Sequence, residues 1–234
     1  MISSRVPALA GLAGCALTAV LAAVGQIDPD PQLDHASLTV SDFAVHDRGG
    51  VTDAAMVVFG LSAWCLVPLL RQRAPQILLT LFGTAMVVAA VAPTDLGPLT
   101  PTGYLHRYAS MLAFVALPVA AVLQRPRTRG VRWTATAAAV FAGLMLASAT
   151  LGDRWLIGAV ERYLLITEVL LLSLLCWRGL RDRPGSWKIR DSWSKVERAH
   201  QDVMVRRRHP GLVETRRGLA TAIRLSREVG QPWP

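Results

Sequence analysis

The chain has 234 residues, of which 52% are hydrophobic and 18% are charged, and its mean hydropathy is +0.37. A soluble domain of this length needs more polar surface than these values provide, so an ordinary soluble globular protein is excluded. The net charge of +9 lies mostly outside the apolar blocks, a distribution typical of membrane topology rather than of nucleic-acid binding.

Six apolar blocks follow one another along the chain, and each approaches the ~20 residues that a helix needs to cross a bilayer. They cover residues 6–25, 52–70, 77–92, 104–123, 133–151 and 155–177. Because backbone groups inside a bilayer must be hydrogen-bonded within the segment, each block is expected to be a helix. We therefore predict an all-α, polytopic transmembrane bundle of six helices over residues 1–178.

The first block could instead be a signal sequence, because residues 12–15 resemble a lipoprotein cleavage box. Its apolar run continues past Cys15 to Val24, however, whereas a lipidated cysteine is normally followed by polar residues. This pattern favours an uncleaved first span. In the loop that follows, two prolines in residues 28–31 end the helix, and residues 38–40 form a short β-prone run.

The segments that connect the blocks alternate in charge along the chain. One set is basic and holds Arg5, Arg71, Arg73, Arg125, Arg127, Arg129 and Arg132. The other set is mainly acidic and holds Asp28, Asp30, Asp34, Asp42, Asp47, Asp95 and Asp153, with Arg48 and Arg154. Since Lys and Arg concentrate on the cytoplasmic side of membrane proteins, both termini are predicted in the cytoplasm and the acidic loops outside.

Residues 179–234 are predicted to form a basic cytoplasmic tail that is partly helical. Apolar residues recur near helical spacing in residues 192–205 and 212–229. A basic amphipathic segment beside a span suits the anionic inner surface of a membrane, so lipid contact is expected around Arg206, Arg207 and Arg208. A solvated tail is the alternative. Nucleic acid is not an expected partner, because this arginine cluster lacks interleaved aromatic residues and any recognisable module.

The sixth block contains three ionisable residues, Glu161, Arg162 and Glu168. Such residues inside a span are costly, and they are usually paired or functional. In the structural interpretation, Arg162 pairs with an acid on a neighbouring helix, and Glu168 is protonated or hydrogen-bonded within the bundle. In the functional interpretation, these residues bind a ligand or handle a proton.

A second polar cluster is expected where the outer loops meet the helix ends. Two histidines and two aspartates there could bind a divalent ion, but no compact ligand spacing occurs, so no metal or other cofactor is predicted. For these residues we favour a role in ion pairing and helix capping at the membrane boundary. The full candidate outer-face site consists of Ser41, Asp42, His46, Asp95, His106, Arg107, Glu161 and Arg162.

Three short stretches stand in a fixed order along these spans. They are residues 37–43 (Ser-Leu-Thr-Val-Ser-Asp-Phe) running on to Gly49-Gly50, residues 92–95 (Ala-Pro-Thr-Asp) followed by Leu105-His106, and residues 161–165 (Glu-Arg-Tyr-Leu-Leu). With them the chain resembles, over roughly residues 6–180, the domain of unknown function number 998 family of six-span bacterial membrane proteins. The resemblance implies a multi-pass protein of the bacterial plasma membrane but no reaction. It places Ser41, Asp42, Asp95, His106 and Arg162 at motif positions, and the basic tail departs from it.

Three functions fit these features. The leading hypothesis is a non-catalytic bundle that binds a lipid or small amphiphile, or supports a membrane protein partner, through an outward-facing polar pocket. The second is an outer-face hydrolase in which His106 acts as acid or base and Asp95 orients it. The third is a small transporter with Glu168 as its proton-coupling group.

Overall fold

The computed structural model describes residues 5–27, 34–46, 50–95, 98, 100–124, 128–151 and 154–181. These residues form helices and no strand. The helices are α1 (Arg5–Gly25), α2 (Val40–His46), α3 (Val51–Leu66), the short 3-10 helix η1 (Val67–Leu69), α4 (Arg73–Val91), α5 (Pro101–Leu123), α6 (Arg129–Thr150) and α7 (Ile157–Arg181). The all-α prediction is confirmed for this part of the chain. The basic tail, with Arg206, Arg207 and Arg208, lies outside the described residues.

Each predicted apolar block lies largely within one long helix, or in the second block within α3 and η1, because a run of about 20 apolar residues favours a helix in a bilayer. Five of the described helices are long and apolar enough to cross a membrane: α1, α3 with η1, α4, α5 and α6. Helix α7 has 25 residues but is not among the five, and it carries Glu161, Arg162 and Glu168. The structure therefore supports a multi-pass helical membrane protein, while a sixth span stays a prediction.

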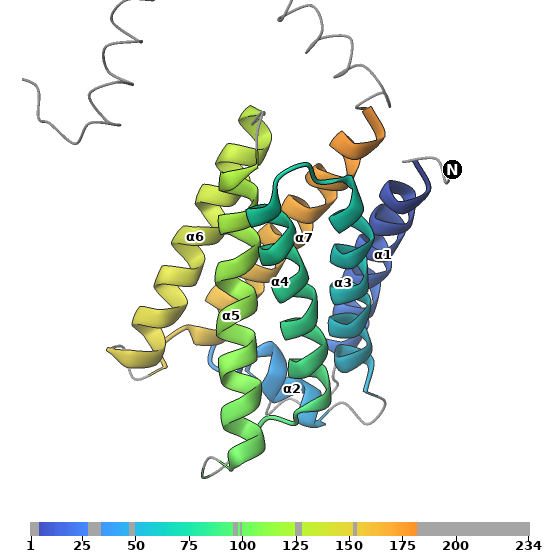
Figure 1. Cartoon of the computed structure of the whole chain (residues 1–234). Helices are drawn as coiled ribbons and strands as arrows, with labels where there is room; N and C mark the ends of the chain where they lie inside the picture. The colour runs from blue at the N-terminus through green and yellow to red at the C-terminus, as the bar shows by residue number, and fades with distance from the viewer. Residues whose placement is uncertain are drawn as a thin grey trace, which may run out of the picture. The chain divides into compact units, whose positions relative to one another are not determined.

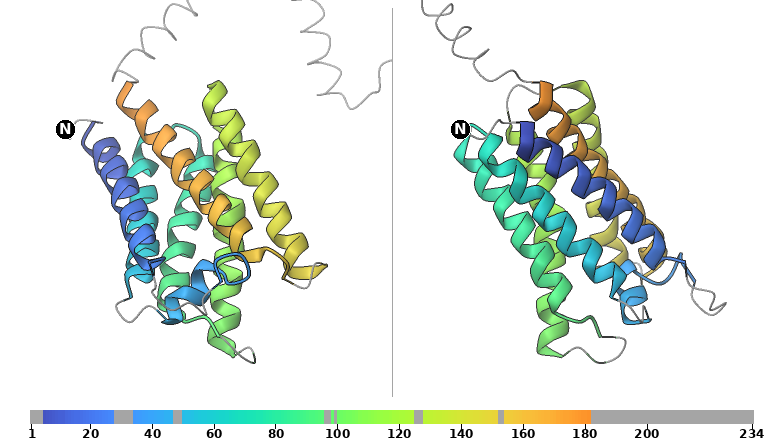
Figure 2. Two further views of the ribbon diagram at one scale, coloured as in Figure 1. Left: turned by 180° about the vertical axis from the view of Figure 1, so that it is seen from behind. Right: turned by 90° about the vertical axis from the view of Figure 1, so that its right-hand side faces the viewer.

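The long helices close into a ring in which neighbours in sequence are mostly neighbours in space (Figure 1). Helix α1 packs on α3, α3 on α4, α4 on α5, α5 on α6 and α6 on α7, and α7 returns to α1. Helix α7 also contacts α3 and α5, and Figure 2 shows it crossing between α1 and α6. A helix with polar residues therefore packs against α1, α3, α5 and α6.

Close helix packing in the ring depends on small residues. A Cβ atom added at Gly60 of α3 would lie 2.6 Å from the carbonyl oxygen of Gly83 of α4. The two backbones therefore touch, which is the usual way that membrane helices gain contact area. Beside this contact, the rings of Phe59 and Phe82 meet edge to face with centroids 5.1 Å apart.

Helix α6 is the least enclosed member of the ring. Its buried residues are Val131, Ala135, Ala138 and Ser148, so the stretch from residue 139 to residue 147 contributes none. This stretch faces α5 across a cavity, which is described below with the candidate site.

The loop after α1 contains the short helix α2, which lies across the end of the bundle where α5 begins (Figure 1). The expectation of a β-prone run at residues 38–40 is wrong. Thr39 precedes α2 and Val40 begins it, and hydrogen bonds from a distant part of the chain fix this conformation.

Candidate functional site

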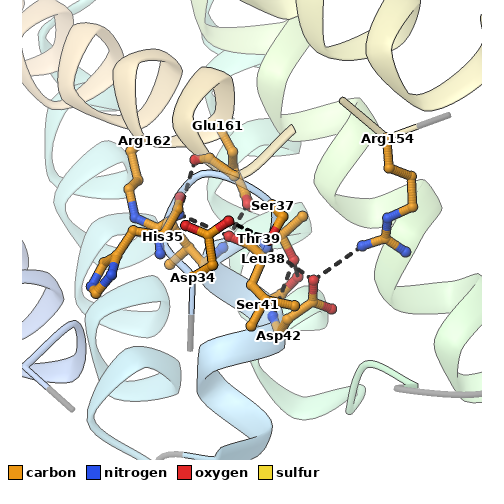
Figure 3. A network of polar contacts seen from close by, with 12 residues as sticks. Asp34, His35, Ser37, Leu38, Thr39, Ser41, Asp42, Arg154, Glu161 and Arg162 are labelled. Carbon is orange, nitrogen blue, oxygen red and sulfur yellow. Dashed lines mark hydrogen bonds and ion pairs between the residues drawn. The ribbon is translucent and has the colours of Figure 1, made fainter. Parts of the chain in front are cut away.

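The N-terminus of α2 is fixed by a reciprocal pair of hydrogen bonds (Figure 3). The Asp42 backbone N–H donates to Thr39 Oγ1 at 3.1 Å, and the Thr39 N–H donates to Asp42 Oδ2 at 2.9 Å. This is a capping box, with aspartate in place of the more usual glutamate or glutamine. The Ser41 hydroxyl lies 3.0 Å from that of Thr39. Both Asp42 and Thr39 are buried, so their polar groups need these partners.

Two residues far along the chain complete this cap. Glu161 of α7 accepts a hydrogen bond from the Val40 N–H at 2.6 Å, and its side chain is buried. Arg154, in the turn between α6 and α7, donates from Nη2 to Asp42 Oδ2 at 3.0 Å. Helix α2 is therefore tied to α7 and to the α6–α7 turn, as Figure 3 shows.

Arg162 anchors the same loop by a different route. Its Nη1 donates to the carbonyl oxygens of His35 and Leu38, each at 2.8 Å, and to that of Gly158 at 2.9 Å. Its Nη2 donates to the side-chain oxygen of Gln26. The guanidinium carbon also lies 4.8 Å from the centroid of the Phe43 ring. Among the described residues Arg162 binds carbonyl oxygens and an aromatic face, and not the acidic partner that the sequence interpretation gave it.

The first turn of α7 receives the backbone of this loop. The N–H groups of Gly158 and Ala159 donate to the Ala36 carbonyl at 3.1 and 3.3 Å, which satisfies donors left free at the helix start. A side chain at position 158 would overlap the Leu38 carbonyl, so glycine is required for this approach. Within the loop, hydrogen bonds from the Ala36 N–H and the Ser37 hydroxyl hold the pKa of Asp34 below its ordinary value.

Asp95 and His106 serve separate partners. The Thr100 N–H donates to Asp95 Oδ2 at 2.7 Å, and the Thr100 hydroxyl in turn accepts from the Gly103 N–H at the start of α5. His106 Nδ1 lies 2.8 Å from the Ala89 carbonyl oxygen and 2.9 Å from that of Ala92. Carbonyl oxygens only accept, so Nδ1 carries a proton, and in the neutral ring Nε2 is left as an acceptor.

A cavity of about 520 Å³ opens beside these groups, between α5, α6 and the first turns of α7. Its polar end is lined by Thr39, Ser41, Asp42, Thr94, Asp95, His106, Arg107, Arg154 and Glu161. Its apolar part is lined by Met111, Phe114, Val115, Pro118, Val119, Ala139, Ala142, Gly143, Met145 and Leu146. From His106 to Val119 the cavity follows α5 for about 20 Å, at 1.5 Å per residue.

The cavity brings together six of the eight predicted site residues: Ser41, Asp42, Asp95, His106, Arg107 and Glu161. Arg162 does not line it. The side chain of His46 lies outside the described residues. The apolar lining was not predicted, although the small residues Ala139, Ala142 and Gly143 on α6 were the available signal. In the described part of the chain, no group of three or more His, Cys, Asp or Glu side chains is placed to hold a metal ion.

Glu168 lies deeper in α7 and apart from this cavity. Its side chain is fully buried, and neither carboxyl oxygen has a hydrogen-bond partner among the described residues. The cavity lining does not include it. The alternative of a hydrogen-bonded Glu168 is therefore not seen in this structure.

Comparison with known protein families gives a match. A family model described as "Protein of unknown function (DUF998)" matches residues 12–178, which run from within α1 to near the end of α7. No curated protein and no solved structure matches the chain.

Proposed function

Since the chain belongs to the DUF998 family of proteins of unknown function, we propose from its cavity that it binds a membrane amphiphile. In this proposal α7 is the sixth span, both termini are cytoplasmic, and the polar end of the cavity faces outward in a bacterial plasma membrane. The alternation of basic and acidic segments supports this orientation.

One observation carries the proposal: the cavity is polar at one end and apolar along its length. Its volume of about 520 Å³ lies within the roughly 300–1,000 Å³ range of small-molecule sites. Its length of about 20 Å along α5 exceeds the ~15 Å that one leaflet contributes to a ~30 Å hydrocarbon core. An acyl chain fits such a space, with its head among the polar residues.

The walls of the cavity favour a ligand that arrives from the bilayer. On α5, Met111 and Val115 are 44% and 56% exposed, and on α6 Leu146 is 52% exposed. These residues line the cavity and are also open to the surroundings of the bundle. A hydrocarbon chain could therefore pass between α5 and α6 without crossing water.

The two alternatives have weaker support. For a hydrolase, the Asp95 carboxylate is bound to Thr100, and His106 is oriented by two backbone carbonyls rather than by Asp95. For a transporter, the buried carboxyl of Glu168 is suitable, but it does not line the cavity. In the first case the two proposed catalytic residues do not contact each other. In the second case the proposed proton-coupling group lies apart from the cavity.

Photolabelling of the full chain tests the amphiphile proposal. The probe is palmitoylglycerol with a diazirine in its acyl chain, added to protein in phosphatidylcholine nanodiscs. We expect crosslinks concentrated on α5 and α6. In the variant Gly143→Phe they should fall to background, because a Cβ at position 143 has open space around it and the ring would fill the cavity.

Val140→Phe is the matched control, because this substitution adds the same ring to the same helix. Val140 is 54% exposed and lies outside the cavity lining. It should label like the unmodified protein. Crosslinks spread evenly over the exposed helices and unchanged by Gly143→Phe would reject the proposed function.

A further inference from the structure

The acidic residues at the polar end of the cavity are all bound to backbone N–H groups at helix starts. Asp42 accepts from Thr39, Glu161 accepts from Val40, and Asp95 accepts from Thr100. N–H groups at a helix start carry partial positive charge and stabilise a neighbouring carboxylate. These three acids are therefore occupied in holding α2 and α5, although they outnumber the arginines.

The two arginines of the cavity lining, Arg107 and Arg154, together make fewer of the described hydrogen bonds than these acids. Arg107 on α5 is exposed, and within the described ranges it makes no hydrogen bond or ion pair. Arg154 uses Nη2 on Asp42, but its side chain is 52% exposed. In the described residues its other guanidinium nitrogens bind nothing. The charged hydrogen-bond donors left at this end of the cavity are therefore those of Arg107 and Arg154.

The backbone that carries Arg154 is held in an uncommon conformation. Arg154 has φ 63° and Leu156 has φ 53°, values in the left-handed region that non-glycine residues adopt rarely. Ser148 maintains this turn: its hydroxyl donates to the Trp155 carbonyl at 2.6 Å, and its own carbonyl accepts from the Arg154 N–H at 3.0 Å. Strained residues that the surrounding structure maintains are concentrated at ligand sites. Here the strained turn directs the Arg154 guanidinium toward Asp42 (Figure 3), which lines the polar end of the cavity.

We propose that the cavity selects a single-chain amphiphile with an anionic head, a carboxylate or a phosphate, which Arg107 and Arg154 bind from α5 and from the α6–α7 turn. This inference rests on the proposed function, because it assigns the head of the same ligand. Guanidinium groups suit both heads, since their paired N–H donors match two oxygens. Arg154 can take up the head while Asp42 keeps its bond to Thr39.

Binding to the full chain in phosphatidylcholine nanodiscs tests the assignment with three palmitoyl ligands: palmitate, palmitoyl lysophosphatidic acid and neutral palmitoylglycerol. A hydrogen bond to a charged group contributes enough to change affinity about 10- to 100-fold. We expect both anionic ligands to bind at least about tenfold more tightly than palmitoylglycerol. The tighter of the two identifies the head that the site prefers.

Arg107→Gln should lower the affinity for the anionic ligands toward that of palmitoylglycerol and leave the affinity for palmitoylglycerol itself unchanged. Arg154→Gln should act in the same direction. Arg132→Gln, which removes an exposed charge at the start of α6, is the control and should have no effect.

The outcomes separate the two proposals. If all three ligands bind equally and Arg107→Gln changes none of them, the anionic head is excluded while amphiphile binding stands. If no palmitoyl ligand binds, or if Gly143→Phe leaves their binding unchanged, the cavity itself is not the site and both proposals fail.

Discussion

Two glycines of the bundle meet opposite surroundings. Gly158, in the first turn of α7, lies against the carbonyl groups of His35 and Leu38, which are backbone atoms that cannot turn aside. Gly143 lies in the middle of α6 with no other atom within 4 Å of an added Cβ. The first glycine is needed for packing, whereas the second leaves a cavity open.

Alanine at these two positions should therefore have opposite effects on stability. Gly158→Ala should lower the free energy of unfolding by about 1–3 kcal/mol, because the added methyl forces the loop away from α7. Gly143→Ala should be neutral, or stabilising by up to ~1 kcal/mol, since alanine favours a helix more than glycine does. Thermal unfolding of the purified protein in one detergent gives both values. An equal loss in the two variants would show that Gly158 is not a contact glycine.

Arg162 shows what sequence reasoning found and what it missed at the level of one side chain. Its position in a span marked it as paired or functional. Two of its partners could not be predicted, because they are carbonyl oxygens of residues more than 120 positions earlier in the chain. Only the docked loop brings those oxygens to α7.

At the level of elements, Arg162 therefore connects the loop and α7. Arg162→Met should lower the free energy of unfolding by about 1–3 kcal/mol, because three backbone carbonyls, two of them in partly buried hydrogen bonds, lose their donor. Arg162→Lys should restore little of this loss, since one ammonium group cannot reproduce the forked contacts to several acceptors.

Limited proteolysis measures this effect directly, because cleavage within residues 34–46 should become faster in Arg162→Met and Arg162→Lys. Arg132→Gln is again the matched control for loss of a basic side chain. If Arg162→Lys resists cleavage as well as the unmodified protein, a positive charge is sufficient and the forked contacts are not required.

The elements differ in how well the sequence predicted them. The long helices followed from apolar blocks, because a bilayer leaves the backbone few other conformations. The seven-residue helix α2 did not, since its start depends on Glu161, which lies 121 positions away. The pairing of Asp95 with His106 that the hydrolase hypothesis needs is not observed, because Thr100 and the end of α4 provide nearer partners for each. The apolar pattern thus predicts the long helices. The short helix and the partners of the polar residues depend on side-chain hydrogen bonds at the helix ends.

At the level of the whole molecule, the site depends on the order of the ring. Helix α7 packs between α1 and α6, so its first turn meets both the loop after α1 and the cavity beside α5. This order brings Asp42, His106 and Arg154 to one end of the bundle. The alternation of basic and acidic loops predicted that these residues lie at the same end of the bundle. It did not predict which helices would leave a cavity between them.

The predicted placement of acidic loops outside and basic loops inside is also the basis for a test of topology. If α3, α4 and α5 each cross the membrane, residue 37 in the α1–α3 loop and residue 129 at the start of α6 lie on opposite sides of it; both are exposed. The native cysteines Cys15, Cys65 and Cys176 are first replaced by alanine. Ser37→Cys should then react in intact cells with a reagent that cannot cross the membrane, whereas Arg129→Cys should react only after permeabilisation. The reverse pattern would invert the bundle and place the cavity mouth in the cytoplasm. Equal reaction of both cysteines in intact cells would show that the charge alternation does not report sidedness in this chain.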